Sequence, residues 1–241
     1  MEPWQLLTTQ AAEWGVPLDD AQVNALKRFY DLLIEGNRRA NLTRITDERE
    51  AVVKHFLDSL SVLRAFSAED RAASLRFIDV GAGAGFPGIP LMALAPAWSG
   101  TQLEATRKKV DFMSESIEAL GLSGRALHGR AEELAQTPEH REKYDLVFGR
   151  AVAELNVLSE LCLPFLKQGG RFVAMKGAGV DEEVSRAQKA LKTLGGEIRQ
   201  IVKFSLPEGF GERALVVVEK TMPTPKAYPR RAGQPAAKPL C

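Results

Sequence analysis

The chain centres on Phe77-Ile78-Asp79-Val80-Gly81-Ala82-Gly83-Ala84-Gly85-Phe86-Pro87-Gly88-Ile89-Pro90-Leu91. Apolar residues lead to an aspartate, glycines then occupy alternate positions, and a second apolar run follows. This order predicts a buried strand, a tight glycine turn and the start of a helix. Glycine has no Cβ atom, so the backbone can turn sharply and a ligand can touch it. The helix would aim free N–H groups and its positive dipole end at that ligand. The alternative is an ordinary strand-to-helix turn that binds nothing.

Two classes of ligand use such a turn. Gly83, Gly85 and Gly88 satisfy the Gly-x-Gly-x-x-Gly pattern of a dinucleotide-binding fold. That frame is awkward, because the predicted strand ends at Val80 and a glycine follows at once. Asp79-x-Gly81-x-Gly83-x-Gly85 instead resembles the first motif of class I S-adenosylmethionine-dependent methyltransferases. In those enzymes the glycines approach the methionine part and the ribose of the cofactor. A nicotinamide-binding fold would normally continue into a catalytic domain, for which we see no remaining residues.

Composition sets limits on the class of protein. A length of 241 residues permits one large α/β domain or a domain with an appendage. The chain is 45% hydrophobic and 26% charged, so a soluble globular core is expected. The net charge of +1 says little about nucleic acid. Two cysteines and three histidines show no paired or clustered spacing, so we expect neither a disulfide framework nor a metal site. No signal peptide or membrane-spanning run is visible, and we expect a cytoplasmic protein.

The pattern along the chain predicts three parts. Residues 1–70 form helices packed on the core: one is expected behind Asp19 or Asp20 and ended by Gly36 or Asn37, and a second amphipathic helix follows Asp47. Residues 71–220 alternate strands and helices, which favours a mostly parallel sheet. Expected strands are 77–80, 101–104, 125–128, 144–148, 171–176, 197–204 and 213–220. The connection between the last two strands, 197–204 and 213–220, is too short for a crossover helix, so one of them should be antiparallel. Residues 221–241 are proline-rich and predicted to form an extended basic arm.

Several polar residues stand at the ends of predicted strands. Glu104 ends the second strand about twenty residues past the glycine turn, where a carboxylate can accept both ribose hydroxyls. A carboxylate at the same spacing could equally bind the ribose of NAD. Ala131 and Glu132 follow the third strand, where the chain of this fold passes the adenine. Either acid could instead be a helix cap. Arg150 follows the fourth strand at the ligand-binding edge, and could instead be a surface ion-pair residue.

The combination of motifs resembles the RsmG family, also called glucose-inhibited division protein B, whose members are small-subunit ribosomal RNA guanine-N7 methyltransferases. The matching pieces are Asn41-Leu42-Thr43, His55-Phe56-Leu57-Asp58-Ser59, the run from Asp79 to Leu91, Lys108-Lys109-Val110-Asp111-Phe112, Arg150-Ala151, Lys176-Gly177, Glu212-Arg213 and Tyr228-Pro229-Arg230-Arg231. They span nearly the whole chain in order. Ala82, Ala84 and Gly149 depart from the residues expected there, at positions where backbone atoms do the work.

The resemblance implies a class I methyltransferase fold, an S-adenosyl-L-methionine cofactor, and 16S ribosomal RNA or the 30S subunit as partner. It implies no membrane and no metal partner. The implied cofactor residues are Gly81, Gly83, Gly85, Phe86, Glu104, Ala105, Thr106, Ala131, Glu132 and Arg150. The implied RNA-binding residues are Asn41, His55, Asp58, Ser59, Lys176, Arg230 and Arg231. No general base is assigned, because guanine N7 already carries a lone pair and positioning can supply much of the rate.

Other functions remain open at this point. A small-molecule methyltransferase could use the same fold, although the basic arm and Lys108-Lys109 speak against it. A non-catalytic RNA-binding or cell-division factor could keep the fold without turnover. The basic arm could also be a disordered tail rather than an RNA contact. Methylation of ribosomal RNA or 30S particles would separate these possibilities.

Overall fold

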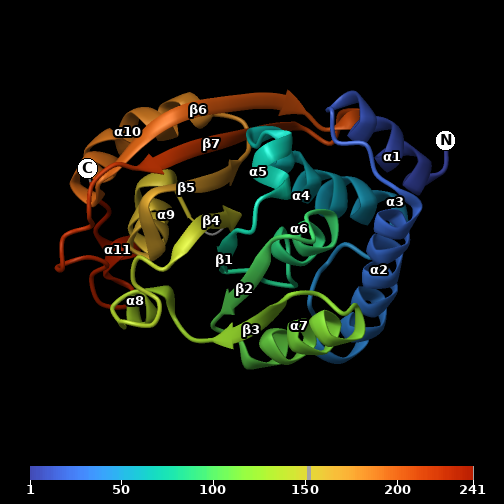
Figure 1. Ribbon diagram of the computed structural model, residues 1–241, viewed down its shortest axis with the longest axis horizontal. Helices are drawn as coiled ribbons and strands as arrows, with labels where there is room; N and C mark the ends of the chain where they lie inside the picture. Colours follow the sequence, from blue (N-terminus) through green and yellow to red (C-terminus); the bar gives the residue numbers. More distant parts are fainter. Residues whose placement is uncertain (151–152, 241) are drawn as a thin grey trace.

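A seven-stranded sheet forms the centre of the computed structural model, which describes residues 1–150 and 153–240 (Figure 1). Its strand order is β3-β2-β1-β4-β5-β7-β6. The strands are β1 (Arg76–Val80), β2 (Ser99–Glu104), β3 (Gly124–His128), β4 (Tyr144–Arg150), β5 (Leu166–Lys176), β6 (Gly196–Ser205) and β7 (Glu212–Lys220). β7 runs antiparallel to both of its neighbours, whereas the pairs from β3 to β5 are parallel. The predicted sheet, with its single antiparallel strand, is confirmed.

Helices cover both faces of this sheet. The described helices are α1 (Pro3–Glu13), α2 (Asp20–Ala40), α3 (Glu48–Ala51), α4 (Asp58–Leu60), α5 (Ala68–Ala72), α6 (Gly88–Leu94), α7 (Arg107–Ala119), α8 (Ala131–Leu134), α9 (Leu155–Cys162), α10 (Val180–Leu194) and α11 (Gln234–Ala237). Successive strand residues face opposite sides. Phe148 accordingly belongs to a hydrophobic cluster that includes residues of α1, α2, α6 and α7, while Val147 belongs to a second cluster with residues of α8, α9 and α10. Both strand faces are therefore buried, as a parallel sheet requires.

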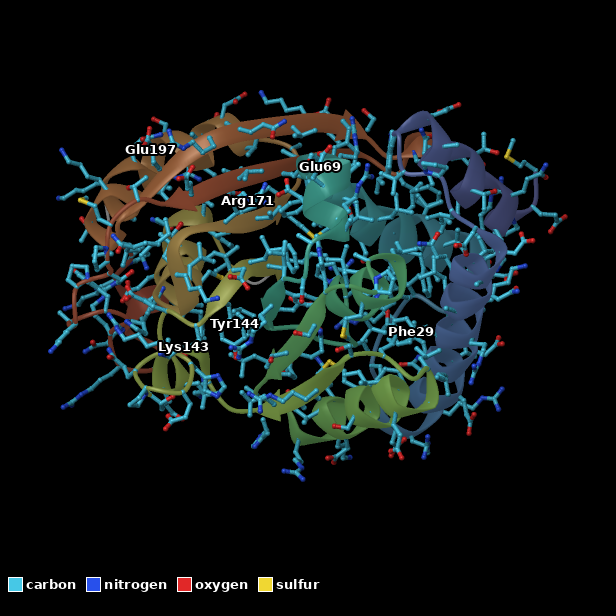
Figure 2. The ribbon with its side chains drawn as sticks, in the orientation of Figure 1. Phe29, Glu69, Lys143, Tyr144, Arg171 and Glu197 are labelled. Carbon is cyan, nitrogen blue, oxygen red and sulfur yellow. The ribbon has the colours of Figure 1, made fainter. Side chains whose placement is uncertain are left out.

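The helix α2 begins as predicted but continues past its expected end. Asp19 caps it by accepting a hydrogen bond from the Gln22 N–H. Gly36 lies inside the helix, where a Cβ atom would come within 2.6 Å of the Phe112 ring of α7. The glycine therefore permits close packing of α2 on α7 instead of ending the helix. Figure 2 shows Phe29 on the side of α2 that faces the rest of the fold, and its ring is fully buried.

The second N-terminal helical segment is irregular, which differs from the single amphipathic helix predicted after Asp47. α3 passes into a π-helical segment (Val52–Leu57), then α4, then a 3-10 segment (Ser61–Ala65). The apolar residues expected on one face of that helix are all buried: Val52, Val53, Phe56, Leu57, Leu60 and Leu63. π-Helical turns are rare and often occur at functional sites. Here the wide turn carries His55 and leads directly into Asp58.

Residues 221–240 contact the rest of the fold and include the short helix α11, which differs from the extended arm expected from their composition. They lie beside α8 and α9, at the opposite side of the molecule from α1 (Figure 1). Arg230 forms an ion pair with Glu160 of α9, and α11 begins with a proline in its first turn. A proline at that position costs no hydrogen bond. The counter-ion comes from 70 positions earlier in the chain, so the local composition of the arm could not reveal it. Cys241 lies outside the described residues.

Candidate functional site

A cavity of about 700 Å³ lies at the carboxyl ends of the central strands. Its wall combines the glycine turn at 81–84, the ends of β4 and β5 with Arg150 and Lys176, the start of β7 with Arg213, and N-terminal residues that include His55. The sheet order reverses between β1 and β4, and ligands of open α/β sheets bind at such a switch point. The topology therefore places the glycine turn where a ligand is expected.

The glycines of the turn serve different purposes. Gly81, Gly83 and Gly85 have φ angles of +74°, +62° and +92°, which other residues adopt only with strain. A Cβ atom on Gly85 would collide with the side chain of Ile89, so this glycine allows the turn to pack on α6. A Cβ atom on Gly83 would meet only the Gly81 carbonyl oxygen, at 4.0 Å. The surface over Gly83 is thus open, and backbone atoms form a cradle there.

Two carboxylates hold this turn in place. Asp79 is fully buried at the end of β1, and its Oδ2 accepts a hydrogen bond of 2.9 Å from the Gly88 N–H. Burial raises the pKa of Asp79 to about 7. The Glu104 carboxylate accepts hydrogen bonds from the Gly83 N–H at 3.0 Å and the Thr106 N–H at 2.9 Å. Glu104 thus lies beside the cradle, and its role toward a ribose stays a prediction.

An aromatic stack forms one side of the cavity. The His55 ring stacks on Phe86 with centroids 4.7 Å apart, and the Arg150 guanidinium lies 5.4 Å from the same Phe86 ring. Thr43 Oγ1 is 3.0 Å from His55 Nε2. Burial, followed by repulsion from Arg150, lowers the pKa of His55 to about 4. The imidazole is therefore neutral at physiological pH and acts as a polar ring, not as a cation.

Ion pairs also line the cavity, and Arg150 takes part in them as well. The Asp58 carboxylate, whose side chain is 8% exposed, lies 3.4 Å from Arg150 Nη1 and 3.2 Å from Arg213 Nε. Burial raises the pKa of Asp58, and the two guanidinium groups oppose that shift. The Lys176 ammonium lies 2.7 Å from a Glu183 carboxylate oxygen and donates to the Ala153 carbonyl oxygen. Two arginines thus share one carboxylate, whereas Lys176 has a carboxylate of its own.

The remaining predicted cofactor residues lie beyond the cavity wall. Ala131 and Glu132 are the first residues of α8. The segment before this helix is hydrogen-bonded to the end of β2, because the Gly129 N–H donates to the Glu104 carbonyl oxygen at 3.1 Å. Glu132 Oε1 accepts a hydrogen bond from the Gly233 N–H of the C-terminal segment, at 3.1 Å. Ala105 and Thr106 are exposed just past the end of β2. Their contacts with a cofactor stay predictions.

The predicted RNA-binding residues divide into two groups. His55, Asp58 and Lys176 line the cavity. The other four residues lie elsewhere: Asn41 ends α2 in a left-handed conformation, Ser59 is buried and donates to the His55 carbonyl oxygen, Arg230 is paired with Glu160, and Arg231 is exposed. Ala151 of the quoted Arg150-Ala151 motif lies outside the described residues.

Sequence reasoning assigned no role to two basic residues of the cavity. Lys54 and Arg213 both line it. Arg213 stands in the motif Glu212-Arg213, which was the available signal, but its partner Asp58 lies 155 positions away in the sequence and could not be identified from it.

Within residues 1–150 and 153–240, no cluster of three or more histidine, cysteine or acidic side chains is placed to hold a metal ion. No helix in the same ranges has the length and apolar character needed to cross a membrane.

Comparison with known proteins yields consistent matches. A family model described as rRNA small subunit methyltransferase G matches residues 22–216. Ribosomal RNA small subunit methyltransferase G of Halalkalibacterium halodurans is 48% identical over 95% of both chains, and that of Pelotomaculum thermopropionicum is 47% identical over 95% of both. Among solved structures, Aeropyrum pernix fibrillarin with bound S-adenosyl-L-methionine resembles the chain with a TM-score of 0.50. That match has 16% identity and covers 61% of this chain and 67% of the other, so it supports the fold alone.

Proposed function

The chain belongs to the family of ribosomal RNA small subunit methyltransferase G, and from this premise we propose that it methylates N7 of a specific guanine in 16S ribosomal RNA. The proposed methyl donor is S-adenosyl-L-methionine. The proposed substrate is 16S ribosomal RNA, free or within the 30S subunit, and the proposed compartment is the cytoplasm.

The observation that carries the proposal is the open glycine cradle at the sheet's switch point. The cavity volume of about 700 Å³ suits a small-molecule ligand. Gly83 leaves its backbone uncovered toward that space, and the Glu104 carboxylate lies within hydrogen-bonding distance of the Gly83 N–H. These residues fit a ligand that carries a ribose diol and an amino-acid end. Gly81, Gly83, Phe86, Glu104 and Arg150 would hold it, with the starts of α7 and α8 on the adenine side.

The chemistry asks little of ionisable side chains. Bound S-adenosylmethionine supplies a methyl group on a positively charged sulfur. Guanine N7 carries a lone pair at its major-groove edge and needs no deprotonation before it attacks. The protein's task is to place N7 in line and to exclude water, which can supply much of the rate. His55 suits this task, because its neutral ring stacked on Phe86 offers a polar edge without a second positive charge.

The substrate must present its guanine outside a regular helix. The major groove of A-form RNA is deep and narrow, so N7 of a paired guanine is hard to reach. A loop, or an RNA held open by ribosomal proteins, would expose it. Membership of the family disfavours a small-molecule methyltransferase. A measurement of methyl transfer would distinguish an enzyme from a non-catalytic factor.

The direct test is methylation of unmethylated 30S subunits and of naked 16S ribosomal RNA with labelled S-adenosylmethionine. Nucleoside mass spectrometry should identify 7-methylguanosine, and borohydride followed by aniline should cleave the RNA at one site. A methylated exocyclic amine or ribose would contradict the proposed atom. Absence of any labelled product from either substrate would contradict the proposed reaction.

The cofactor assignment is tested by Gly83→Val, with Gly121→Val as a matched control. Both glycines have nearly the same left-handed φ, +62° and +63°, so both substitutions impose similar backbone strain. A Cβ atom on Gly121 meets nothing within 4 Å and lies after α7, away from the cavity. We expect calorimetry to show at least tenfold weaker S-adenosylmethionine binding for Gly83→Val alone, which corresponds to about 1.4 kcal/mol. Equal weakening in both variants would mean that strain, not lost space, is responsible.

A further inference from the structure

Arg213 carries an unmatched positive charge beside the cavity. Its Nε contacts Asp58 at 3.2 Å, and its Nη1 donates to the Glu212 carbonyl oxygen at 2.9 Å. In the described part of the chain, Nη2 has no hydrogen-bonding partner. Asp58 also serves Arg150, so two guanidinium groups face a single carboxylate. The Arg150 and Arg213 side chains are only 19% and 26% exposed, and a partly desolvated charge without a counter-ion is costly.

The other cations around the cavity are matched one to one. Lys176 pairs with Glu183, and Lys54 pairs with Glu50. Glu154, the remaining carboxylate of the described cavity wall, pairs with Arg186 at 3.3 Å. Among the described residues of the wall, the excess charge is therefore confined to the two arginines that share Asp58. A guanidinium group with free N–H donors is suited to bind a carboxylate or a phosphate. An anion at this point would supply the missing counter-charge.

Arg213 also lies where two cavities meet. It lines the cavity of about 700 Å³ that contains the glycine cradle, and a neighbouring cavity of about 400 Å³. Gly177 is common to both cavities, and the loop 177–179 leads from the end of β5 to the start of α10. A Cβ atom on Gly179 would meet nothing within 4 Å, so the backbone of this loop is open to a ligand. A chain molecule could thus occupy both spaces and pass Arg213.

We propose that Arg213 is a phosphate-binding residue on the substrate side, which holds the RNA backbone next to the target guanosine while the base occupies the cavity beside the cradle. The inference rests on the function proposed above. Arg150 lies over Phe86 on the cofactor side of Asp58, and Arg213 lies on the side of the second cavity. Asp58 is then a positioning residue, because its two oxygens set the spacing between the two guanidinium groups. The alternative source of the anion is the carboxylate of the cofactor's own methionine part.

Three variants test this assignment in the full-length protein. Arg213→Gln removes the charge, and Arg213→Lys keeps the charge but loses the forked donors. Arg199→Gln is the matched control, since Arg199 is an exposed arginine of β6, the partner strand of β7, lies outside both cavities, and has carboxylate partners in Glu197 and Glu219. Each variant is assayed for KM and kcat on unmethylated 30S subunits, for S-adenosylmethionine affinity by calorimetry, and for the salt dependence of 30S binding.

We expect Arg213→Gln to raise KM for 30S subunits about tenfold, as loss of a charged hydrogen bond does, with S-adenosylmethionine affinity unchanged. The slope of log affinity against log salt should flatten by about 0.7, the loss of one single-stranded phosphate contact. Arg213→Lys should recover part of the KM, and Arg199→Gln should match the wild type. An unchanged KM and slope in Arg213→Gln would overturn the proposal.

Weakened S-adenosylmethionine binding with an unchanged KM for 30S subunits would also overturn it, and would place the cofactor's carboxylate at Arg213 instead. Unchanged cofactor affinity shows at the same time that the variant is folded. Failure of the proposed function gives a different result, because the wild-type protein would then methylate neither 30S subunits nor 16S ribosomal RNA.

Discussion

Two sites of this protein pair arginine with a buried carboxylate, but they differ in how many arginines share that carboxylate. At the cavity, Arg150 and Arg213 share the single carboxylate of Asp58. In the C-terminal segment, Arg230 has the carboxylate of Glu160 to itself, with side-chain contacts of 2.6, 2.9 and 3.2 Å. The first site has charge left over for a ligand, and the second has none. Charge balance therefore distinguishes an arginine that binds a ligand from one that holds the fold, although Arg213 and Arg230 both occur in motifs that resemble those of the family.

The surroundings of the two sites agree with this distinction. The Glu160 side chain is 1% exposed, and the chain around Arg230 is held further by Arg141, which donates to the Tyr228 and Thr224 carbonyl oxygens. Tyr228 and Leu240 pack against the hydrophobic cluster under α9 and α10. The C-terminal segment is therefore packed against the core, and deleting it would disturb the fold as well as any RNA contact. Single substitutions are the better probe.

Breaking the ion pair between Arg230 and Glu160 should have the largest effect on stability. Arg230→Gln leaves the Glu160 carboxylate buried without its counter-ion, which typically costs about 3–5 kcal/mol. Arg231→Gln is the matched control, because the neighbouring Arg231 side chain is exposed, and it should change stability by less than about 0.5 kcal/mol. Urea denaturation measures both. Similar small losses in the two variants would show that the pair at Glu160 is not structural.

Asp58→Asn should have an intermediate effect. It removes the shared charge but keeps a hydrogen-bond acceptor, and the two guanidinium groups that remain can still reach the cavity. We expect a loss of about 2 kcal/mol in the free energy of unfolding, in the range for hydrogen bonds to charged groups. The same urea experiment applies. A loss as large as that of Arg230→Gln would mean that Asp58 serves the fold in the way that Glu160 does.

The smallest effect concerns His55, which lies beside the excess charge. Its pKa of about 4 in the folded protein is below the ordinary value of 6.5. Between these values the unfolded chain binds a proton that the folded chain does not, so stability falls as pH falls through this window. The difference between pH 7 and 5.5 amounts to about 1 kcal/mol. Urea titrations of His55→Gln at both values should lack this contribution. An unchanged pH dependence would show that His55 is not held neutral by burial and Arg150.

Much of the fold could be predicted because its signals are local. Apolar strands, the glycine turn, the cap at Asp19 and the short connection before β7 each depend on neighbouring residues, and each was found where expected. The site was predicted in part for the same reason. Gly81 follows the end of β1 and Arg150 ends β4, and parallel strands bring their carboxyl ends to one edge. Gly83 and Phe86 lie in the turn between β1 and α6 and also line the cavity.

Only the tertiary structure could decide what depends on distant partners. The sequence by itself determined the sheet and the cradle, because hydrophobic periodicity and glycine placement act over a few residues. The family was indicated by the resemblance of motifs along the chain. It did not determine that Gly36 admits the Phe112 ring, that the segment carrying His55 is π-helical, or that the C-terminal segment is folded. Nor could it separate Arg213 from Arg230, since their carboxylates lie 155 and 70 positions away. An arginine's role depends on how many carboxylates reach it and how far water is excluded, and both follow from packing.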